Sequence, residues 1–286
     1  MTGAVAGAGL ELGPGPREVD GVAWASAGDP GSPAVPVLLL HGVTDSGECW
    51  APVARHLAGS RLVVTVDARG HGRTPLGDEP FTIAALARDA AAVVGAVVGR
   101  PVVVVGHSMG GIVAEELALT APALVAGLVL EEPAWDGAAD RTADGVPAFL
   151  PGFLASFAGV PEDALVAWSR RANPTWADDE HGPWARSKTQ LDQRLVQVPH
   201  EWAARDWVAA LADVAAPVAL VTGVTERGSV VDAAARARAH AVLGDRLTDV
   251  VLPTAGHNAR RDDRAGFLAA LDAALARVER VSPGGP

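Results

Sequence analysis

Short, continuous apolar runs alternate with longer stretches of helical character along most of the chain. The runs cover residues 35–40, 61–66, 102–105, 125–130, 217–222 and 247–252. A run that is apolar at every position predicts a strand buried on both faces of a sheet. The stretches with helical spacing or composition cover residues 47–57, 82–98, 112–119, 230–243 and 264–278. This alternation predicts an α/β fold with a mainly parallel, doubly wound sheet.

The two ends and the middle of the chain depart from this pattern. Residues 17–27 predict two short strands joined by a turn at Asp20 and Gly21. Residues 133–205 show no strand pattern and hold most of the tryptophans, so we expect short helices there, for example over 161–171 and 188–196. The expected organisation is a core formed by residues 17–132 and 206–280, a helical cap over 133–205, and disordered tails at 1–16 and 281–286.

A serine joins the apolar run at 102–105 to the helical stretch that follows it, in the sequence Gly106-His107-Ser108-Met109-Gly110. Gly-x-Ser-x-Gly between a strand and a helix is typical of a nucleophile elbow, a strained turn that exposes the serine Oγ above the sheet. The alternative is a glycine-rich loop that carries a serine by chance, because a five-residue pattern is short. His41, Asp67, Glu132 and His257 also lie just after apolar runs, at the expected strand ends, which favours the elbow. Parallel strands bring their carboxyl ends to one edge, where catalytic loops lie.

A serine nucleophile needs a base, and the base needs a carboxylate that fixes its tautomer. His257 is the candidate base, because it follows the last apolar run and lies C-terminal to Ser108. Two glutamates compete for the role of the acid. Glu132 follows the run at 125–130, and Glu226 lies in the loop after the run at 217–222. We favour Glu132 and keep Glu226 as the alternative.

Two backbone N–H groups are expected to form the oxyanion hole. One belongs to Met109, directly after Ser108, and the other to Val43, after His41-Gly42. The aromatic residues of the cap either form its own core or line an apolar pocket. Trp135, close to Glu132 in the sequence, is the candidate for substrate contact.

Composition narrows the class of protein. A net charge of −11 argues against a nucleic acid or an anionic membrane surface as a partner. No apolar run is long enough to span a bilayer, and the N-terminus lacks the positive start of a signal peptide. The single cysteine, Cys49, suits a reducing compartment, so we expect a cytoplasmic protein. No metal or organic cofactor is expected, since the sequence has no clustered ligands or phosphate-binding loop.

These motifs together resemble those of the α/β-hydrolase fold family, in the form that carries a helical cap. The resemblance covers residues 17–278 and rests on Leu39-Leu40-His41-Gly42, Asp67-Ala68-Arg69-Gly70-His71-Gly72, the Ser108 elbow, and Gly256-His257. In relatives the Asp67 loop is structural. The chain departs from the family in having glutamate at both candidate acid positions. Relatives that are dehalogenases or epoxide hydrolases use an aspartate nucleophile, so Ser108 argues against both activities.

The expected function is therefore that of a serine hydrolase that cleaves a carboxylic ester or lactone of an apolar small molecule through an acyl-enzyme. The alternative with the same triad is a C–C bond hydrolase or a biosynthetic acyl transferase or cyclase. A third hypothesis, from another class, is a non-catalytic ligand-binding protein on this fold. Neither the substrate nor the oligomeric state follows from these motifs.

Overall fold

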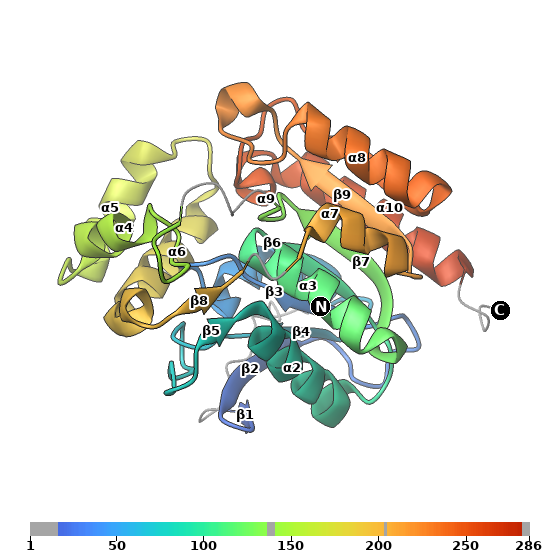
Figure 1. Ribbon diagram of the computed structural model, residues 1–286, viewed down its shortest axis with the longest axis horizontal. Coiled ribbons are helices and arrows are strands. Elements are labelled where there is room, and N and C mark those ends of the chain that lie inside the picture. The colour runs from blue at the N-terminus through green and yellow to red at the C-terminus, as the bar shows by residue number, and fades with distance from the viewer. Residues whose placement is uncertain (1–16, 136–140, 203–204, 282–286) are drawn as a thin grey trace, which may run out of the picture.

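An eight-stranded sheet runs through the middle of the molecule (Figure 1). The structure is a computed structural model that describes residues 17–135, 141–202 and 205–281. The tail predicted at 1–16 and residues 282–286 of the tail predicted at 281–286 lie outside the described residues. The strands are β1 (Arg17–Val19), β2 (Val22–Ala27), β3 (Val37–Leu40), β4 (Val63–Val66), β6 (Val102–His107), β7 (Val125–Glu131), β9 (Val218–Thr222) and β10 (Leu247–Val251). Their order is β1-β2-β4-β3-β6-β7-β9-β10, with β1 and β2 antiparallel to their neighbours and the other pairs parallel. The predicted α/β fold is confirmed.

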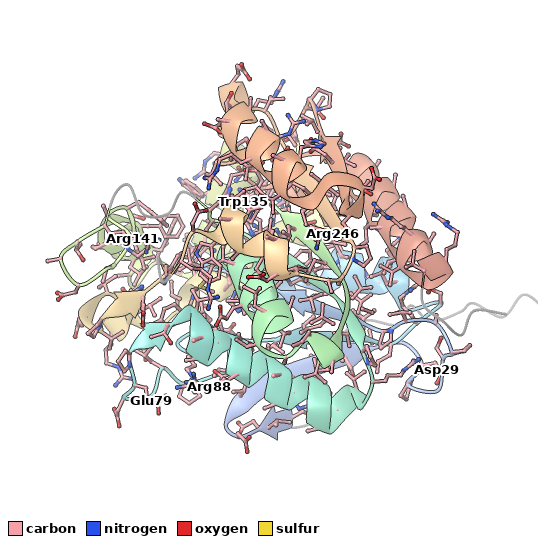
Figure 2. All side chains as sticks on the ribbon, turned by 45° about the vertical axis from the view of Figure 1, so that its right-hand side comes forward. Asp29, Glu79, Arg88, Trp135, Arg141 and Arg246 are labelled. Carbon is pink, nitrogen blue, oxygen red and sulfur yellow. The ribbon has the colours of Figure 1, made fainter. Side chains whose placement is uncertain are left out.

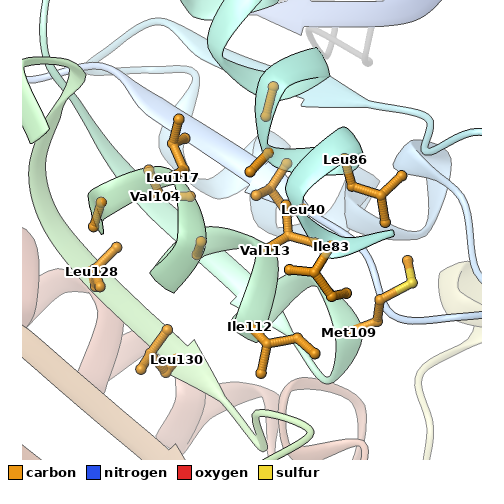
Figure 3. Packing of buried hydrophobic residues seen from close by; sticks show 14 of the residues in the cluster. Leu40, Ile83, Leu86, Val104, Met109, Ile112, Val113, Leu117, Leu128 and Leu130 are labelled. Atoms are coloured by element: carbon orange, nitrogen blue, oxygen red, sulfur yellow. The ribbon is translucent and has the colours of Figure 1, made fainter. Parts of the chain in front are cut away.

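Helices cover both faces of the sheet and form a separate apolar core on each. The helices of one face are α2 (Ile83–Val93), α3 (Met109–Thr120), α7 (Trp207–Ala210) and α8 (Ala233–Leu243); those of the other are α1 (Ala51–Leu57) and α10 (Arg264–Val281). Strand β6 serves both cores, because Val102 and Val104 point to the first and Val103 and Val105 to the second. Figure 3 shows Val104 in the first core, near Leu117 of α3.

A group of helices between β7 and β9 lies to one side of the sheet, on the left of Figure 1. It consists of α4 (Leu150–Phe157), α5 (Glu162–Ala172) and α6 (Asp178–Thr189). The predicted helix over 161–171 is confirmed by α5, whereas the one over 188–196 is wrong. Helix α6 already ends at Thr189, and the Asp192 side chain then accepts a hydrogen bond from Arg194 N at 2.9 Å, which starts a separate 3₁₀ turn over Gln193–Gln197.

Other boundaries also differ from the sequence pattern. The prediction that residues 133–205 contain no strand is wrong in one place. Strand β8 (His200–Glu201) pairs with β5 (Phe81–Thr82) in a small parallel sheet. Helix α8 begins only at Ala233, after Asp232, whose side chain caps Ala235 N at 2.7 Å. Helix α10 runs to Val281, one residue into the predicted tail. No helix within the described ranges is long and apolar enough to cross a membrane.

Candidate active site

Ser108 lies on a sharp turn between β6 and α3. Its backbone has φ +53° and ψ −115°, which is a strained conformation for a residue with a Cβ. The turn is tight, since a Cβ at Gly106 would overlap the Gly110 carbonyl and a Cβ at Gly110 would overlap the Leu40 carbonyl. The glycines of the predicted elbow are therefore required by close backbone approach. Helix α3 begins at Met109, so the Met109 N–H has no intrahelical partner and lies next to Ser108.

His257 lies in the loop between β10 and α9 (Ala259–Asp262), and it lines the same cavity as Ser108. Its backbone is held by His107, the residue before the serine, whose Nε2 hydrogen-bonds to His257 O at 2.9 Å. The two imidazole rings are 4.9 Å apart between centroids. Burial, with Arg260 and His257 nearby, lowers the pKa of His107 well below its usual value, so this ring is neutral and donates from Nε2.

The Glu132 carboxylate is fully buried behind His257. It accepts hydrogen bonds from Gly223 N (2.8 Å) and Ser229 Oγ (2.7 Å) on Oε1 and from Val230 N (2.7 Å) on Oε2. His257 Nδ1 lies 3.6 Å from Oε2, a separation that must shorten for a hydrogen bond to form. Burial raises the pKa of Glu132, but the nearby His257 and the hydrogen bonds from Ser229, Gly223 and Val230 together outweigh it and lower the pKa below the usual value. The group is therefore a carboxylate at neutral pH.

The structure distinguishes the two candidate acids by their surroundings. Glu226 is exposed in a 3₁₀ turn over Thr225–Arg227, and its carboxylate accepts a 3.4 Å hydrogen bond from Thr225 Oγ1. Glu132 has φ +46°, an uncommon value for a residue other than glycine, and this turn directs its side chain under the loop that contains Ser229 and Val230. Of the two carboxylates, Glu132 is the one paired with His257.

The loop that contains Val43 packs directly against the serine. A Cβ at Gly42 would lie 3.2 Å from Ser108 Cβ and 2.7 Å from His107 Nδ1, so only glycine allows this approach. Thr44 N donates to His71 Nε2 at 3.2 Å, and His71 Nδ1 donates to Arg69 O at 2.8 Å. Burial and the neighbouring His41 lower the pKa of His71 to about 3, which keeps this ring a neutral acceptor.

A cavity of about 580 Å³ lies over Ser108 and His257, between the core and the helices of residues 133–205. Six aromatic side chains line it: Phe149, Phe153, Trp168, Trp176, Trp184 and Trp202. Trp135, the predicted substrate contact, which is labelled in Figure 2, is not among the residues that line the cavity. Its indole is buried in the first core and donates from Nε1 to Glu115 Oε1 at 2.6 Å. Closeness to Glu132 in the sequence therefore did not identify the aromatic residues of the cavity.

Charged residues also reach the cavity wall, and the sequence pattern did not single them out. Lys188, Asp45 and Arg261 line it, and all three are buried. One signal was available, because Lys188 is the only lysine among 23 basic residues. Within the described ranges, no group of three histidine, cysteine or carboxylate side chains is arranged to hold a metal ion.

A mainly parallel sheet with a serine on a strained turn after a central strand is the architecture of the α/β-hydrolases, a class of enzymes. The chain belongs to the alpha/beta hydrolase family, whose profile matches residues 37–271. It is 33% identical over 258 residues to a putative carbamate hydrolase, RutD, of Variovorax paradoxus, covering 87% of this chain and 94% of that one. It is 38% identical over 166 residues to the lipase LipV of Mycobacterium tuberculosis, covering 57% of this chain but only 59% of LipV.

Two solved structures share the fold. One is an N-formylmaleamic acid deformylase from Pseudomonas putida S16, with a TM-score of 0.72, 24% identity, and coverage of 90% of this chain and 98% of that one. The other is Est816, described as an N-acyl homoserine lactone degrading enzyme, with a TM-score of 0.68, 24% identity and the same coverage. Family membership makes the protein a hydrolase, while its substrate is a separate question.

Proposed function

We propose that the protein is a serine hydrolase that cleaves a carboxylic ester or lactone of an apolar small molecule through an acyl-enzyme. The observation that carries this proposal is the buried Glu132 carboxylate, which three donors hold beside His257 at the cavity that Ser108 also lines. A buried carboxylate behind a histidine fixes the tautomer in which Nδ1 carries the proton and Nε2 is free to act as a base.

In the proposed reaction, Ser108 Oγ attacks the carbonyl carbon while His257 Nε2 takes the hydroxyl proton. The negative charge on the carbonyl oxygen is stabilised by the backbone N–H groups of Met109 and Val43. His257 then gives the proton to the departing alkoxide, and the alcohol leaves. A water molecule, deprotonated by His257, attacks the acyl-enzyme, and the acid is released as Ser108 recovers its proton.

Aromatic lining supports an apolar substrate, because Trp and Phe side chains offer apolar area with few hydrogen-bonding groups. Among the similar proteins are a lipase, a putative carbamate hydrolase and a lactone-degrading enzyme. Esters, carbamates and lactones each contain an acyl carbonyl that a serine can attack, so the substrate panel should include all three.

A fluorophosphonate probe with mass spectrometry tests the nucleophile, and p-nitrophenyl esters with acyl chains of different length test the reaction. We expect labelling at Ser108, no labelling of Ser108→Ala, and loss of turnover by about 10³-fold or more in that variant. Ser156→Ala, an exposed serine of the cap, is the control and should behave as the parent. A parent protein that is not labelled at Ser108, or a Ser108→Ala variant with full turnover, would refute the proposal. Cleavage of a diketone with esters left intact would favour the C–C hydrolase alternative.

A further inference from the structure

Lys188, the single lysine of the chain, directs its ammonium group at the loop before the first core helix. It is the penultimate residue of α6, and its side chain is only 1% exposed. Nζ donates to Thr44 O at 2.7 Å, Asp45 Oδ1 at 3.0 Å and Ser187 Oγ at 3.1 Å. An ammonium has three N–H groups, so these acceptors occupy all of them. Lys188 therefore holds a protein loop although it lies in the cavity wall.

The loop that Lys188 holds is strained. Thr44 has φ +75°, which is a true outlier for a β-branched residue. Such a conformation persists only where the surroundings enforce it. Here Thr44 is held from both sides: its N–H donates to His71 Nε2, and its carbonyl accepts from Lys188. Thr44 directly follows Val43, so its backbone angles affect where the Val43 N–H points.

The remaining contacts of Asp45 connect this loop to other parts of the site. Asp45 Oδ2 accepts from Arg260 (3.1 Å) and Arg261 (2.9 Å), two residues of α9 that follow His257 closely. Arg260 also donates from its backbone N–H (2.7 Å) and its guanidinium (3.0 Å) to Glu131, the neighbour of Glu132. One buried network thus connects the Val43 loop, the His257 loop and the end of β7, and Lys188 joins α6 of the cap to it.

We propose that Lys188 of α6 is a positioning residue for the oxyanion loop, by which we mean the loop that contains Val43, Thr44 and Asp45. Lys188 holds this loop in the strained conformation in which the Val43 N–H can donate to the oxyanion. This inference rests on the proposed serine hydrolase function. It predicts that Lys188 affects the transition state, in which the oxyanion forms, and has little effect on substrate binding. The compact ammonium suits this role, because its three N–H groups rotate about one atom to reach separate acceptors, whereas the donors of a guanidinium are fixed in one plane.

Lys188→Met tests the proposal, with Arg186→Met as a matched control. Arg186 lies on the same helix and also connects it to the core, because its Nε lies 2.9 Å from Glu48 Oε2. Its other partner is Glu162, and neither glutamate belongs to the oxyanion loop. We expect Lys188→Met to lower kcat per active site by roughly 10²-fold with KM changed less than about threefold. The affinity for a trifluoromethyl ketone, which forms an oxyanion on the serine, should fall in parallel. Arg186→Met should stay within about threefold of the parent in each quantity.

Fluorophosphonate titration counts competent sites, so partial unfolding of a variant does not imitate a loss of kcat. Asp45 keeps both arginine partners in Lys188→Met, which favours folding. A second test uses Thr44→Gly, because glycine adopts φ +75° without strain. In that background, the Lys188→Met effect on kcat should shrink to below about tenfold.

Three results would overturn the role of Lys188: an unchanged kcat per site, a loss confined to KM with unchanged ketone affinity, or an equal loss with and without Thr44→Gly. These outcomes leave the proposed function intact as long as the parent is labelled at Ser108. A parent that the fluorophosphonate does not label would overturn the proposed function itself, and the role of Lys188 with it.

Discussion

Replacing the Glu132 carboxylate by an amide should reduce turnover far more than it reduces folding stability. The carboxylate accepts from Gly223 and Ser229 on one oxygen and from Val230 on the other, and His257 Nδ1 lies 3.6 Å from that second oxygen. In Glu132→Gln, the amide NH₂ must take one of these two places and then faces a backbone N–H donor. One or two buried donors lose their acceptor, which costs about 1–3 kcal/mol of unfolding free energy. A well-folded protein tolerates this loss.

The effect on catalysis is larger because an amide does not stabilise the imidazolium, and in one of its two orientations it favours the wrong tautomer of His257. Loss of the acid at a serine–histidine–acid site costs roughly 10²–10⁴-fold in kcat, which is about 3–5 kcal/mol of transition-state stabilisation. The assay is kcat/KM for the best p-nitrophenyl ester at pH 7.5, with urea unfolding of the same samples. Glu226→Gln is the control, and as an exposed residue it should change stability by less than about 0.5 kcal/mol and leave turnover unchanged. The reasoning is refuted if Glu132→Gln keeps more than a tenth of parental kcat/KM, or if Glu226→Gln is the variant that loses it.

Three further substitutions probe the surroundings of the site. The pKa of His71 is about 3 in the folded protein, so its contribution to stability is complete above pH 6.5 and is lost as the pH falls. In urea unfolding, His71→Gln should therefore reduce the difference in unfolding free energy between pH 7.5 and pH 5 by about 2 kcal/mol. An unchanged difference between the two pH values would contradict this. Burial raises the pKa of Glu115 well above its usual value, so the contribution of Glu115 to stability should fall as the pH rises above about 4.5, and in Glu115→Gln the same titration should show a more positive change of stability with pH than in the parent. Gly42→Ala would push a methyl group against His107 and Ser108, and its kcat should drop about 10²-fold, while Gly59→Ala, with open space at its Cβ, should match the parent in the ester assay.

The sequence predicts much of the fold because its signals are local. Four consecutive valines before Gly106 predict a strand that is buried on both faces, and the structure divides them between two cores. The end of the helical stretch before Asp192 could not be predicted from the spacing of apolar residues. It depends on one hydrogen bond, which the Asp192 side chain accepts from Arg194 N.

Candidate residues at strand ends were predictable for the same reason. Ser108 and His257 follow apolar runs, and parallel strands bring such positions to one edge of the sheet. The aromatic wall of the cavity was not predictable in this way. Trp135 is close to Glu132 in the chain, yet its indole donates to Glu115, while the tryptophans that line the cavity come from α5, α6 and the segments that follow them.

By itself, then, the sequence determined the alternation of strands and helices, the family, and the serine and histidine candidates, since each depends on residues that are neighbours in the chain. Only the tertiary structure distinguished the surroundings of Glu132 from those of Glu226, because the donors that hold Glu132 lie more than 90 residues further along the chain. It also decided the surroundings of Lys188, whose partner Asp45 is 143 positions away. Contacts over such separations depend on how whole elements pack, and the local pattern of apolar and polar residues carries no information about them.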